Sequence, residues 1–494
     1  MTSTFGAHLT AAAAETPSRT ALVFEDRTWT YAGLERAVRR TVARLDKHGV
    51  RPGDRVVMQG AARPEALITL FAVTRMGAVL VPLHPQVTGG ELAVVCEETR
   101  PVAVVADGGF PAGTGHRLSW ADLHPAGDEG AFGDEDPAPP SFGPPAGSDV
   151  AVIAFTSGTS GRPKGVALTH DNLHWSMVNG LARLPFGEDD TALVSTPLAH
   201  VAVLGGLPQY TWARRGTVVL APRFDPDLFV DLVREHRVTC AFAVPAMSAL
   251  LARHPRFTGG DLDTLRWILS GGSPAQSATR ELFRARGIGV VNSYGLTETA
   301  AGVTYSAPEA PAGSTGSPCP HVELTVVDPE GTPAPAGTPG EIWVRGPSVA
   351  AVYWTAAGPV PVTDGAGWFR SGDRGLFDAE GRLSVVGRLK DTIITGGENV
   401  DPAEVENALA DLPGIVEVAV SGAPDPVYGE VVTAFLVVGA THPGGSPSLE
   451  DVRGHLDGRL ARHKWPRRVR LVPALPRGAT GKLQRTRLAT LLDD

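Results

Sequence analysis

The stretch FTSGTSGRPKG, residues 155–165, places the strongest constraint on the fold of this chain. It gathers four hydroxyl side chains, three glycines, one arginine and one lysine in eleven residues. The apolar segment DVAVIAF, residues 149–155, leads directly into it and predicts a short buried strand. We therefore expect a loop at the carboxyl edge of an α/β sheet, which is where such sheets bind ligands.

The composition of this loop suits a polyphosphate. Glycines let backbone N–H groups approach a ligand closely, the hydroxyl groups add donors, and Lys164 adds a positive charge. A flexible glycine- and serine-rich linker is the simplest alternative, but a linker does not need a buried strand before it. The P-loop of NTPases is another alternative. That motif requires Ser or Thr after its lysine, whereas Gly165 follows Lys164 here.

The whole chain has 494 residues, of which 43% are apolar, so we expect more than one domain. The net charge of -9 argues against nucleic acid as a partner. No apolar run reaches the roughly 18 residues of a membrane helix, and the N-terminal residues lack the basic start of a signal peptide. Three widely spaced cysteines fit a reducing compartment. These features predict a soluble, cytoplasmic protein with neither a membrane nor a nucleic acid as partner.

Lysine is rare in this chain. Only five of the 44 basic residues are lysines, so we expect lysine mainly where a compact, flexible ammonium group is needed. Lys164, Lys390 and Lys482 all lie in glycine-flanked or charged stretches that look like motifs. These three lysines are therefore candidates for a functional role.

Helical and strand patterns alternate over residues 11–106 and 149–291, as βα units do. Between them, residues 127–147 are rich in Pro, Gly and acidic residues and predict a surface connection. Short strands and turns after residue 316 predict a small β subdomain. From residue 391 the order helix, strand, strand, helix, strand predicts a compact α+β domain.

Two further strand ends carry polar residues. LRWILSGGSPAQSATRELF predicts a strand, a glycine turn and a helix with Ser273 as N-cap and Pro274 as first helical residue. GIGVVNSYGLTET predicts a strand that runs into a polar turn. There Asn292 can pair with a purine edge, Tyr294 can stack on it, and Glu298 can hold Mg²⁺. A turn asparagine, a core tyrosine and a solvated glutamate remain the alternatives for these three residues.

The order of motifs resembles that of the ANL superfamily of adenylate-forming enzymes, over nearly the full length of the chain. The matching stretches are FTSGTSGRPKG, STPLAHVAVLGG, NSYGLTET, GEIWVRG, FRSGD, GRLKDTIITGGENVDPAEVE and PRGATGKLQR. The resemblance implies an α/β fold with a large N-terminal core over residues 1–389, built from several subdomains. It also implies a small mobile α+β lid over residues 390–494, with Lys390 as the hinge.

The resemblance also implies a role for individual residues. Lys482 would bridge the substrate carboxylate and the α-phosphate, with Glu298 and His200 as further catalytic residues. Glu298 and Thr156 would hold Mg²⁺, and Gly396 and Gly397 would line a thiol tunnel. The substrate pocket would include His200, Val201, Gly271 and Gly295. The implied ATP site consists of Thr156, Ser157, Gly158, Thr159, Ser160, Gly161, Lys164, Gly272, Ser273, Pro274, Asn292, Ser293, Tyr294, Gly295, Thr297, Asp373 and Arg388.

The function implied is an ATP- and Mg²⁺-dependent ligase that adenylates a carboxylic acid and passes the acyl group to a thiol, with CoA as the expected acceptor. Amino-acid activators usually carry aspartate where this chain has Val201, which disfavours an α-amino acid. Ala199 and Asp401 depart from the aromatic residues often found at their positions.

Three alternatives remain. The first is transfer of the activated acid, or of a small inorganic acid adenylate, to an amine. The second is loading of a carrier protein. The third is a non-catalytic nucleotide-binding homologue, against which Lys482, Glu298 and Asp373 argue. The sequence leaves open whether the protein is a monomer or a homodimer.

Overall fold

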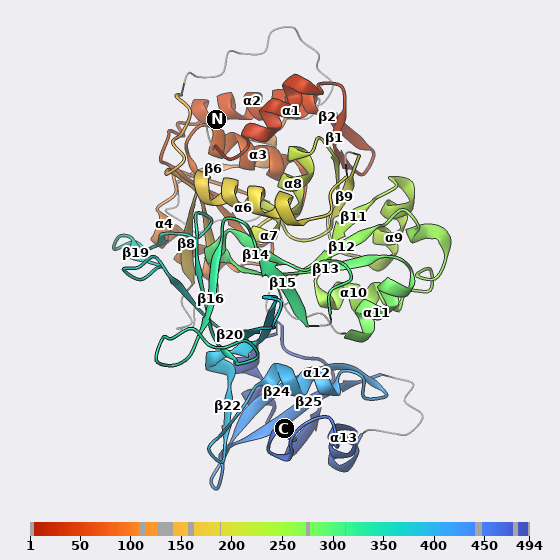
Figure 1. The fold of residues 1–494 in the computed structure, drawn as a ribbon. Helices are drawn as coiled ribbons and strands as arrows, with labels where there is room; N and C mark the ends of the chain where they lie inside the picture. The colour runs from red at the N-terminus through yellow and green to blue at the C-terminus, as the bar shows by residue number, and fades with distance from the viewer. Residues whose placement is uncertain are drawn as a thin grey trace. The chain divides into compact units, whose positions relative to one another are not determined.

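The computed structural model in Figure 1 describes residues 4–107, 115–125, 142–156, 163–187, 189–272, 277–311, 313–439, 447–477 and 483–492. It divides into two compact units. Unit 1 consists of Met1–Ala275, Thr279–Leu324 and Val344–Phe369, and unit 2 consists of Gln276–Ala278, Thr325–Trp343 and Arg370–Asp494. Most of the predicted connection over residues 127–147 lies outside the described residues.

The first sheet of unit 1 has the strand order β19-β18-β8-β7-β4-β3-β5-β6. From β7 to β6 its strands are parallel, while β8, β18 and β19 are added antiparallel at one edge. The bounds are β3 Arg55–Gln59, β4 Val79–Leu83, β5 Ala103–Ala106, β6 His116–Leu118, β7 Val150–Thr156, β8 Lys164–Thr169, β18 Val352–Trp354 and β19 Val360–Pro361.

The second sheet runs, within unit 1, in the order β15-β14-β13-β12-β11-β9-β10-β1-β2. The strands from β13 to β1 are parallel, and antiparallel strands flank them on both sides. The bounds are β1 Thr20–Phe24, β2 Arg27–Thr30, β9 Thr191–Val194, β10 Thr217–Leu220, β11 Cys240–Phe242, β12 Trp267–Ser270, β13 Gly289–Leu296, β14 Ala301–Tyr305 and β15 Ser314–Pro318.

Helices pack on both sheets, as βα units require. Their bounds are α1 Ala7–Glu15, α2 Tyr31–Lys47, α3 Pro64–Arg75, α4 Gly89–Thr99, α5 Trp120–Leu123, α6 His170–Arg183, α7 Val201–Leu204, α8 Leu207–Ala213, α9 Pro226–Glu235, α10 Pro245–Ala252 and α11 Ser277–Ala285. Two 3₁₀ turns also occur here, η1 Gly260–Leu262 and η2 Thr297–Thr299. Among the described residues no helix is long and apolar enough to cross a membrane.

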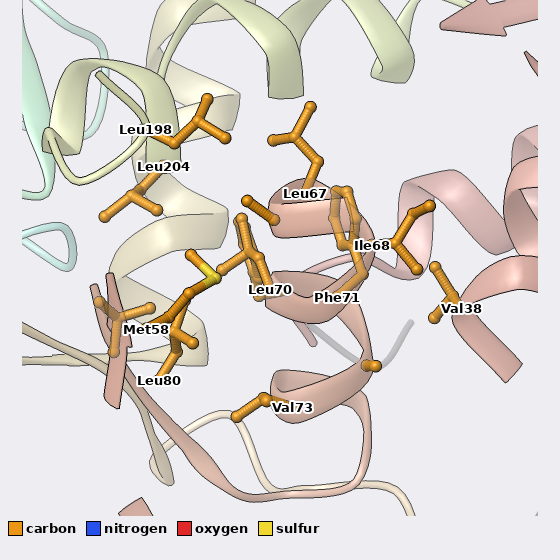
Figure 2. Packing of buried hydrophobic residues seen from close by; sticks show 14 of the residues in the cluster. Val38, Met58, Leu67, Ile68, Leu70, Phe71, Val73, Leu80, Leu198 and Leu204 are labelled. Atoms are coloured by element: carbon orange, nitrogen blue, oxygen red, sulfur yellow. The ribbon is translucent and has the colours of Figure 1, made fainter. Parts of the chain in front are cut away.

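Helix α3 lies at the centre of the main core. Pro64 at its first position suits a helix start, and its residues from Ala66 to Thr74 are buried without a polar face. In Figure 2, Ile68 and Phe71 lie toward Val38 of α2, while Leu70 lies toward Met58 of β3. Truncating a buried aromatic such as Phe71 costs about 3–5 kcal/mol. This core holds together the elements whose ends carry the candidate site.

Unit 2 contains most of the run β16-β17-β20-β21 and a sheet with the order β23-β22-β25-β24, in which β26 also pairs with β25. The bounds are β16 Glu323–Val327, β17 Gly340–Arg345, β20 Phe369–Phe377, β21 Leu383–Arg388, β22 Ile393–Thr395, β23 Glu398–Val400, β24 Ile415–Asp425, β25 Gly429–Val438, β26 Arg468–Leu471, α12 Pro402–Leu409 and α13 Leu449–Leu456. The 3₁₀ turns are η3 Leu389–Asp391, η4 Arg462–Lys464, η5 Arg485–Arg487 and η6 Ala489–Leu491.

The predicted α/β class, with a large N-terminal part and a smaller α+β C-terminal part, is confirmed. The order α12, β24, β25, α13, β26 is the one expected from residue 391 onward. The β22–β23 hairpin before it was not predicted. The boundary and hinge at Lys390 stay predictions.

Candidate active site

The predicted strand before the glycine-rich loop is present as β7. It is parallel to β4, ends at Thr156, and returns as β8, which begins at Lys164. The register places Thr156 directly opposite Lys164. The two ends of the loop are thus fixed side by side at the carboxyl edge of a parallel sheet, as expected.

Several predicted site residues lie outside the described residues. They are Ser157, Gly158, Thr159, Ser160, Gly161, Ser273, Pro274 and Lys482. Their roles stay predictions.

Glu298 lies in the 3₁₀ turn η2, Thr297–Thr299, directly after β13. The Thr299 hydroxyl closes this turn by donating to the carbonyl of Ala301 at 2.8 Å. The backbone N–H of Ala350 donates to the carbonyl of Glu298 at 2.8 Å. Main chain from two separate segments therefore fixes the position from which the Glu298 carboxylate extends.

Tyr353 of β18 connects Glu298 with Lys164. Its hydroxyl donates to Oε1 of Glu298 at 3.0 Å, and Nζ of Lys164 lies 5.4 Å from the centre of its ring. Burial, and next the negative charge of Glu298, raise the pKa of Tyr353, so the phenol stays protonated as a donor. The sequence analysis missed Tyr353, because no local motif marks it.

Asn292 presents a buried acceptor. Asn292 is only 8% exposed. Its Nδ2 donates to the carbonyl of Ser314 at 3.2 Å. Its Oδ1 has no hydrogen-bond partner among the described residues. A buried acceptor without a partner costs free energy, which a ligand N–H can offset. The exocyclic amine of adenine is such a donor.

The predicted strand that runs into a polar turn is present, but β13 continues to Leu296 and the turn is η2, so Asn292 and Tyr294 lie in the strand. Asn292 pairs in parallel with Ser270 of β12, and from Ser293 onward the strand pairs with the antiparallel β14. After β13 the chain turns at η2 and returns as β14, whose backbone pairs with residues 293–296 and keeps them extended. Tyr294 is consequently a strand residue, with only 7% of its surface exposed.

The glycines next to β13 differ in what surrounds them. A Cβ at Gly295 would lie 2.0 Å from the carbonyl oxygen of Ala301, so packing alone requires glycine there. A Cβ at Gly271 would approach nothing closer than the Ser293 carbonyl oxygen, at 3.6 Å. Gly272 has a φ of 86°, in the left-handed region that favours glycine. At Gly271, therefore, neither packing nor backbone conformation requires glycine, and the missing side chain leaves space beside β13.

His200 is the residue before α7, and Val201 is the first residue of that helix. The ring of His84, which follows β4, lies with its centre 6.5 Å from that of His200. Nδ1 of His84 accepts the N–H of Gln86 at 3.1 Å, and burial lowers the pKa of His84. Its imidazole is therefore neutral, with the proton on Nε2. His84 was also missed, although a histidine directly after a buried strand was a usable signal.

In unit 2, Asp373 and Arg388 face each other across β20 and β21. Nε of Arg388 lies 2.8 Å from Oδ1 of Asp373, and Asp373 is only 4% exposed. Such a charge-assisted pair holds the carboxylate in a fixed orientation. The sequence resemblance placed both residues in the ATP site but did not predict that their side chains form an ion pair.

The turn of the β22–β23 hairpin contains Gly396 and Gly397, with φ values of 60° and 87°. The N–H of Gly396 donates to the carbonyl of Tyr428 at 2.9 Å. The guanidinium carbon of Arg467 lies 3.9 Å from the centre of the Tyr428 ring. Lys390 is exposed in the 3₁₀ turn η3. The glycine turn is thus held beside an aromatic ring and a cation.

A metal ion at Glu298 would need ligands from a substrate. In the described part of the chain, no three His, Cys, Asp or Glu side chains gather to hold a metal ion. Mg²⁺ usually takes one or two protein carboxylates and fills its other positions with phosphate oxygens and water. Glu298, with the Thr156 end of the loop in the same unit, fits that pattern.

Comparison with known proteins gives two family matches. Residues 9–354 match the family described as AMP-binding enzyme, and residues 404–482 match the AMP-binding enzyme C-terminal domain. Feruloyl-CoA synthase from Amycolatopsis sp is 39% identical over 94% of both chains.

Two solved structures extend the comparison. O-succinylbenzoate coenzyme A synthetase from Bacillus subtilis, in complex with ATP and magnesium, has a TM-score of 0.85 and 31% identity, covering 97% of this chain and 98% of that one. An amide bond synthetase from Marinactinospora thermotolerans has a TM-score of 0.84 and 30% identity, covering 98% of this chain and 99% of that one.

Proposed function

Since this chain belongs to the AMP-binding enzyme family, we propose that it is an ATP-dependent ligase that joins a carboxylic acid to CoA. In the first half-reaction the acid displaces pyrophosphate from ATP and forms an acyl-adenylate. In the second, the thiol of CoA displaces AMP and takes the acyl group. The family confirms the resemblance to adenylate-forming enzymes, and the CoA synthetases among the relatives support the acceptor.

One observation carries the proposal: Lys164 and Glu298 both contact Tyr353, Lys164 at its ring and Glu298 at its hydroxyl, and Thr156 lies across the strand pair from Lys164. A triphosphate with its magnesium ion needs an ammonium group for the phosphates and a carboxylate for the metal. When bound, the metal neutralises charge on the leaving pyrophosphate. Lys164 and the loop that begins at Thr156 would bind the same phosphates.

The adenosine part has separate partners. Oδ1 of Asn292 would accept the exocyclic amine of adenine, which removes the buried unpaired acceptor. Tyr294 and the segment from Gly272 to Pro274 would enclose the base. In unit 2, Asp373 would accept from the ribose hydroxyls while Arg388 keeps its carboxylate oriented.

Adenylation requires an anionic carboxylate to approach an anionic phosphate. A mobile ammonium between them offsets the repulsion most as charge develops, and we assign this task to Lys482. Its retention in a chain with five lysines is consistent with the assignment. We further propose that residues 390–494 pivot at Lys390 between the two half-reactions.

The acid would lie between His200, Val201 and the glycines at residues 271 and 295. Gly271 leaves space that any side chain would reduce, and Val201 offers no carboxylate to pair with an α-amine. The acyl groups named for the two CoA synthetases described above, feruloyl and o-succinylbenzoyl, both contain a benzene ring, while other relatives are named as fatty-acid CoA ligases. Aromatic acids without an α-amine are therefore the first class to test.

CoA is the acceptor that the second unit favours. A Cβ at Gly397 would meet nothing within 4 Å, so this backbone would leave room for a narrow pantetheine arm, whereas Gly396 packs against the Tyr428 ring. The Tyr428 ring, with Arg467 against it, offers a stacking surface and a cation close to that turn. An amine acceptor is the second candidate, because the amide bond synthetase matches the chain over nearly its full length.

The experiment is acid-dependent pyrophosphate release over a panel of aromatic, aliphatic and amino acids, with and without CoA. We expect release with aromatic acids and thioester formation when CoA is present, detected by mass spectrometry. Release without any thioester, together with amide formation from added amines, would favour the second candidate. No release with any acid would remove the ligase assignment.

A further inference from the structure

The strand register places Tyr353 beside Lys164. Tyr353 pairs with Val166 of β8 in the antiparallel pair β18–β8. Side chains two residues apart in a strand point to the same face, so Lys164 is a diagonal neighbour of Tyr353 on that face. The distance of 5.4 Å between the Lys164 Nζ and the ring centre is within the range of a cation–π contact. Backbone pairing, rather than a flexible loop, sets this contact.

The other end of Tyr353 contacts Glu298. A carboxylate only accepts hydrogen bonds, so the phenol donates, and it occupies Oε1 at 3.0 Å. Tyr353 is half-buried and packs against the main core, which limits how far it can move. The hydroxyl thus holds one carboxylate oxygen of Glu298 and leaves Oε2 for another ligand.

Tyr353 also contacts two side chains of opposite charge. In the described part of the chain, Lys164 and Glu298 form no direct ion pair and meet only through Tyr353. A direct pair would occupy both the group that binds phosphate and the group that binds the metal. It would have to break before the metal–nucleotide complex could enter.

We propose that Tyr353 is a positioning residue that orients Glu298 toward the metal and keeps Lys164 from pairing with it before the nucleotide binds. This inference rests on the proposed function, since it assumes that Glu298 is the metal ligand. It assigns a task to the phenol hydroxyl, which is distinct from the packing task of the ring.

The test is Tyr353→Phe, which keeps the ring and removes the hydroxyl. Mn²⁺ replaces Mg²⁺ as the probe, and its binding to the protein with a non-hydrolysable ATP analogue is followed by electron paramagnetic resonance. Loss of a hydrogen bond to a charged group is expected to weaken Mn²⁺ binding about tenfold. The KM for the acid should not change, because the residues that Tyr353 contacts, Glu298 and Lys164, are assigned to the metal and the phosphates.

The matched control is Tyr31→Phe. Tyr31 is buried in the same unit, and its hydroxyl donates to the carbonyl of Gly216 at 2.6 Å, away from the candidate site. We expect Tyr31→Phe to bind Mn²⁺ like the parent even if it is less stable. A double-mutant cycle with Glu298→Gln adds a second readout: once Glu298 is replaced, Tyr353→Phe should have no further effect.

Two outcomes would overturn the inference alone. The first is that the parent and Tyr353→Phe bind Mn²⁺ equally well in the presence of the ATP analogue. The other is equal weakening by Tyr353→Phe and Tyr31→Phe, which would mean a general loss of stability. If the parent binds no metal–nucleotide complex and releases no pyrophosphate with any acid, the proposed function itself falls, and the inference with it.

Discussion

Replacing Asp401 with asparagine is expected to stabilise unit 2 at neutral pH and to flatten the pH dependence of its stability. Asp401 is the N-cap of α12, and its Oδ1 accepts the N–H of Ala403 at 3.0 Å. Its Oδ2 has no hydrogen-bond partner among the described residues. A Cβ on Gly387 would lie 2.0 Å from this oxygen, so main chain packs closely against it. Asp401 itself is 6% exposed.

The size of the expected stability change follows from the raised pKa of Asp401. Burial raises this pKa from 3.8 to about 6, although the Ala403 N–H and the charges of Arg374 and Arg485 act to lower it. Because the folded state binds the proton more tightly, this contribution to stability is complete below pH 3.8 and is lost as pH rises through about 6. At about 1.36 kcal/mol per pH unit, the loss reaches about 3 kcal/mol above pH 7.

The assay is thermal unfolding of the parent and Asp401→Asn by calorimetry from pH 4 to pH 8. Asparagine is as good an N-cap as aspartate, so the variant should unfold at a higher temperature than the parent at pH 8 and at a similar temperature at pH 4. Asp457→Asn, at an exposed position in the same unit, is the control and should follow the parent. A stability difference between Asp401→Asn and the parent that stays the same at every pH would refute the reasoning.

Three other substitutions test the site. Lys482→Ala should reduce acid-dependent pyrophosphate release by about 10²–10³-fold while a presynthesised acyl-adenylate is still converted to thioester; an equal loss in both reactions would contradict the assignment. Gly271→Ala should fold normally, because the added Cβ would meet nothing closer than 3.6 Å, and should raise the KM of bulky acids more than that of small ones; a raised KM for ATP instead would move Gly271 out of the acid pocket. Lys390→Pro should keep adenylation but accumulate bound acyl-adenylate in the presence of CoA; thioester formation at the parent's rate would exclude a hinge there.

Local patterns predicted the strand ends that carry the candidate site. The buried run before Thr156 and the strand before Gly271 are visible as short apolar segments, because burial in a parallel sheet makes a strand apolar on both faces. The extension of β13 past Asn292 was not predictable in this way. It depends on β14, which supplies backbone partners to residues whose own sequence favours a turn.

The residues that were missed act through contacts between distant segments. Tyr353 reaches Glu298 only because β18 pairs with β8, and two consecutive aromatic residues in a short strand look like ordinary core. His84 follows β4 of the first sheet and His200 follows β9 of the second, so the contact between their rings depends on how the two sheets of unit 1 pack. Sequence spacing contains no information on either pairing.

The β22–β23 hairpin was missed for a different reason. Its strands have three residues each, too few for alternation of polar and apolar residues to show, and its turn contains the glycines that suggested a tunnel. Asp401 follows this hairpin, and its burial against Gly387 depends on how β21 packs. The raised pKa of Asp401 is therefore a property of the folded unit and not of its local sequence.

The central claim is that this chain activates a carboxylic acid as an adenylate and transfers it to CoA. The most direct measurement is mass spectrometry of the products formed from ATP, Mg²⁺, CoA and an aromatic acid, together with pyrophosphate and AMP in the same sample. The account predicts equal amounts of AMP, pyrophosphate and acyl-CoA, and bound acyl-adenylate when CoA is left out. Pyrophosphate and AMP without acyl-CoA, for every acid that supports their release, would contradict it.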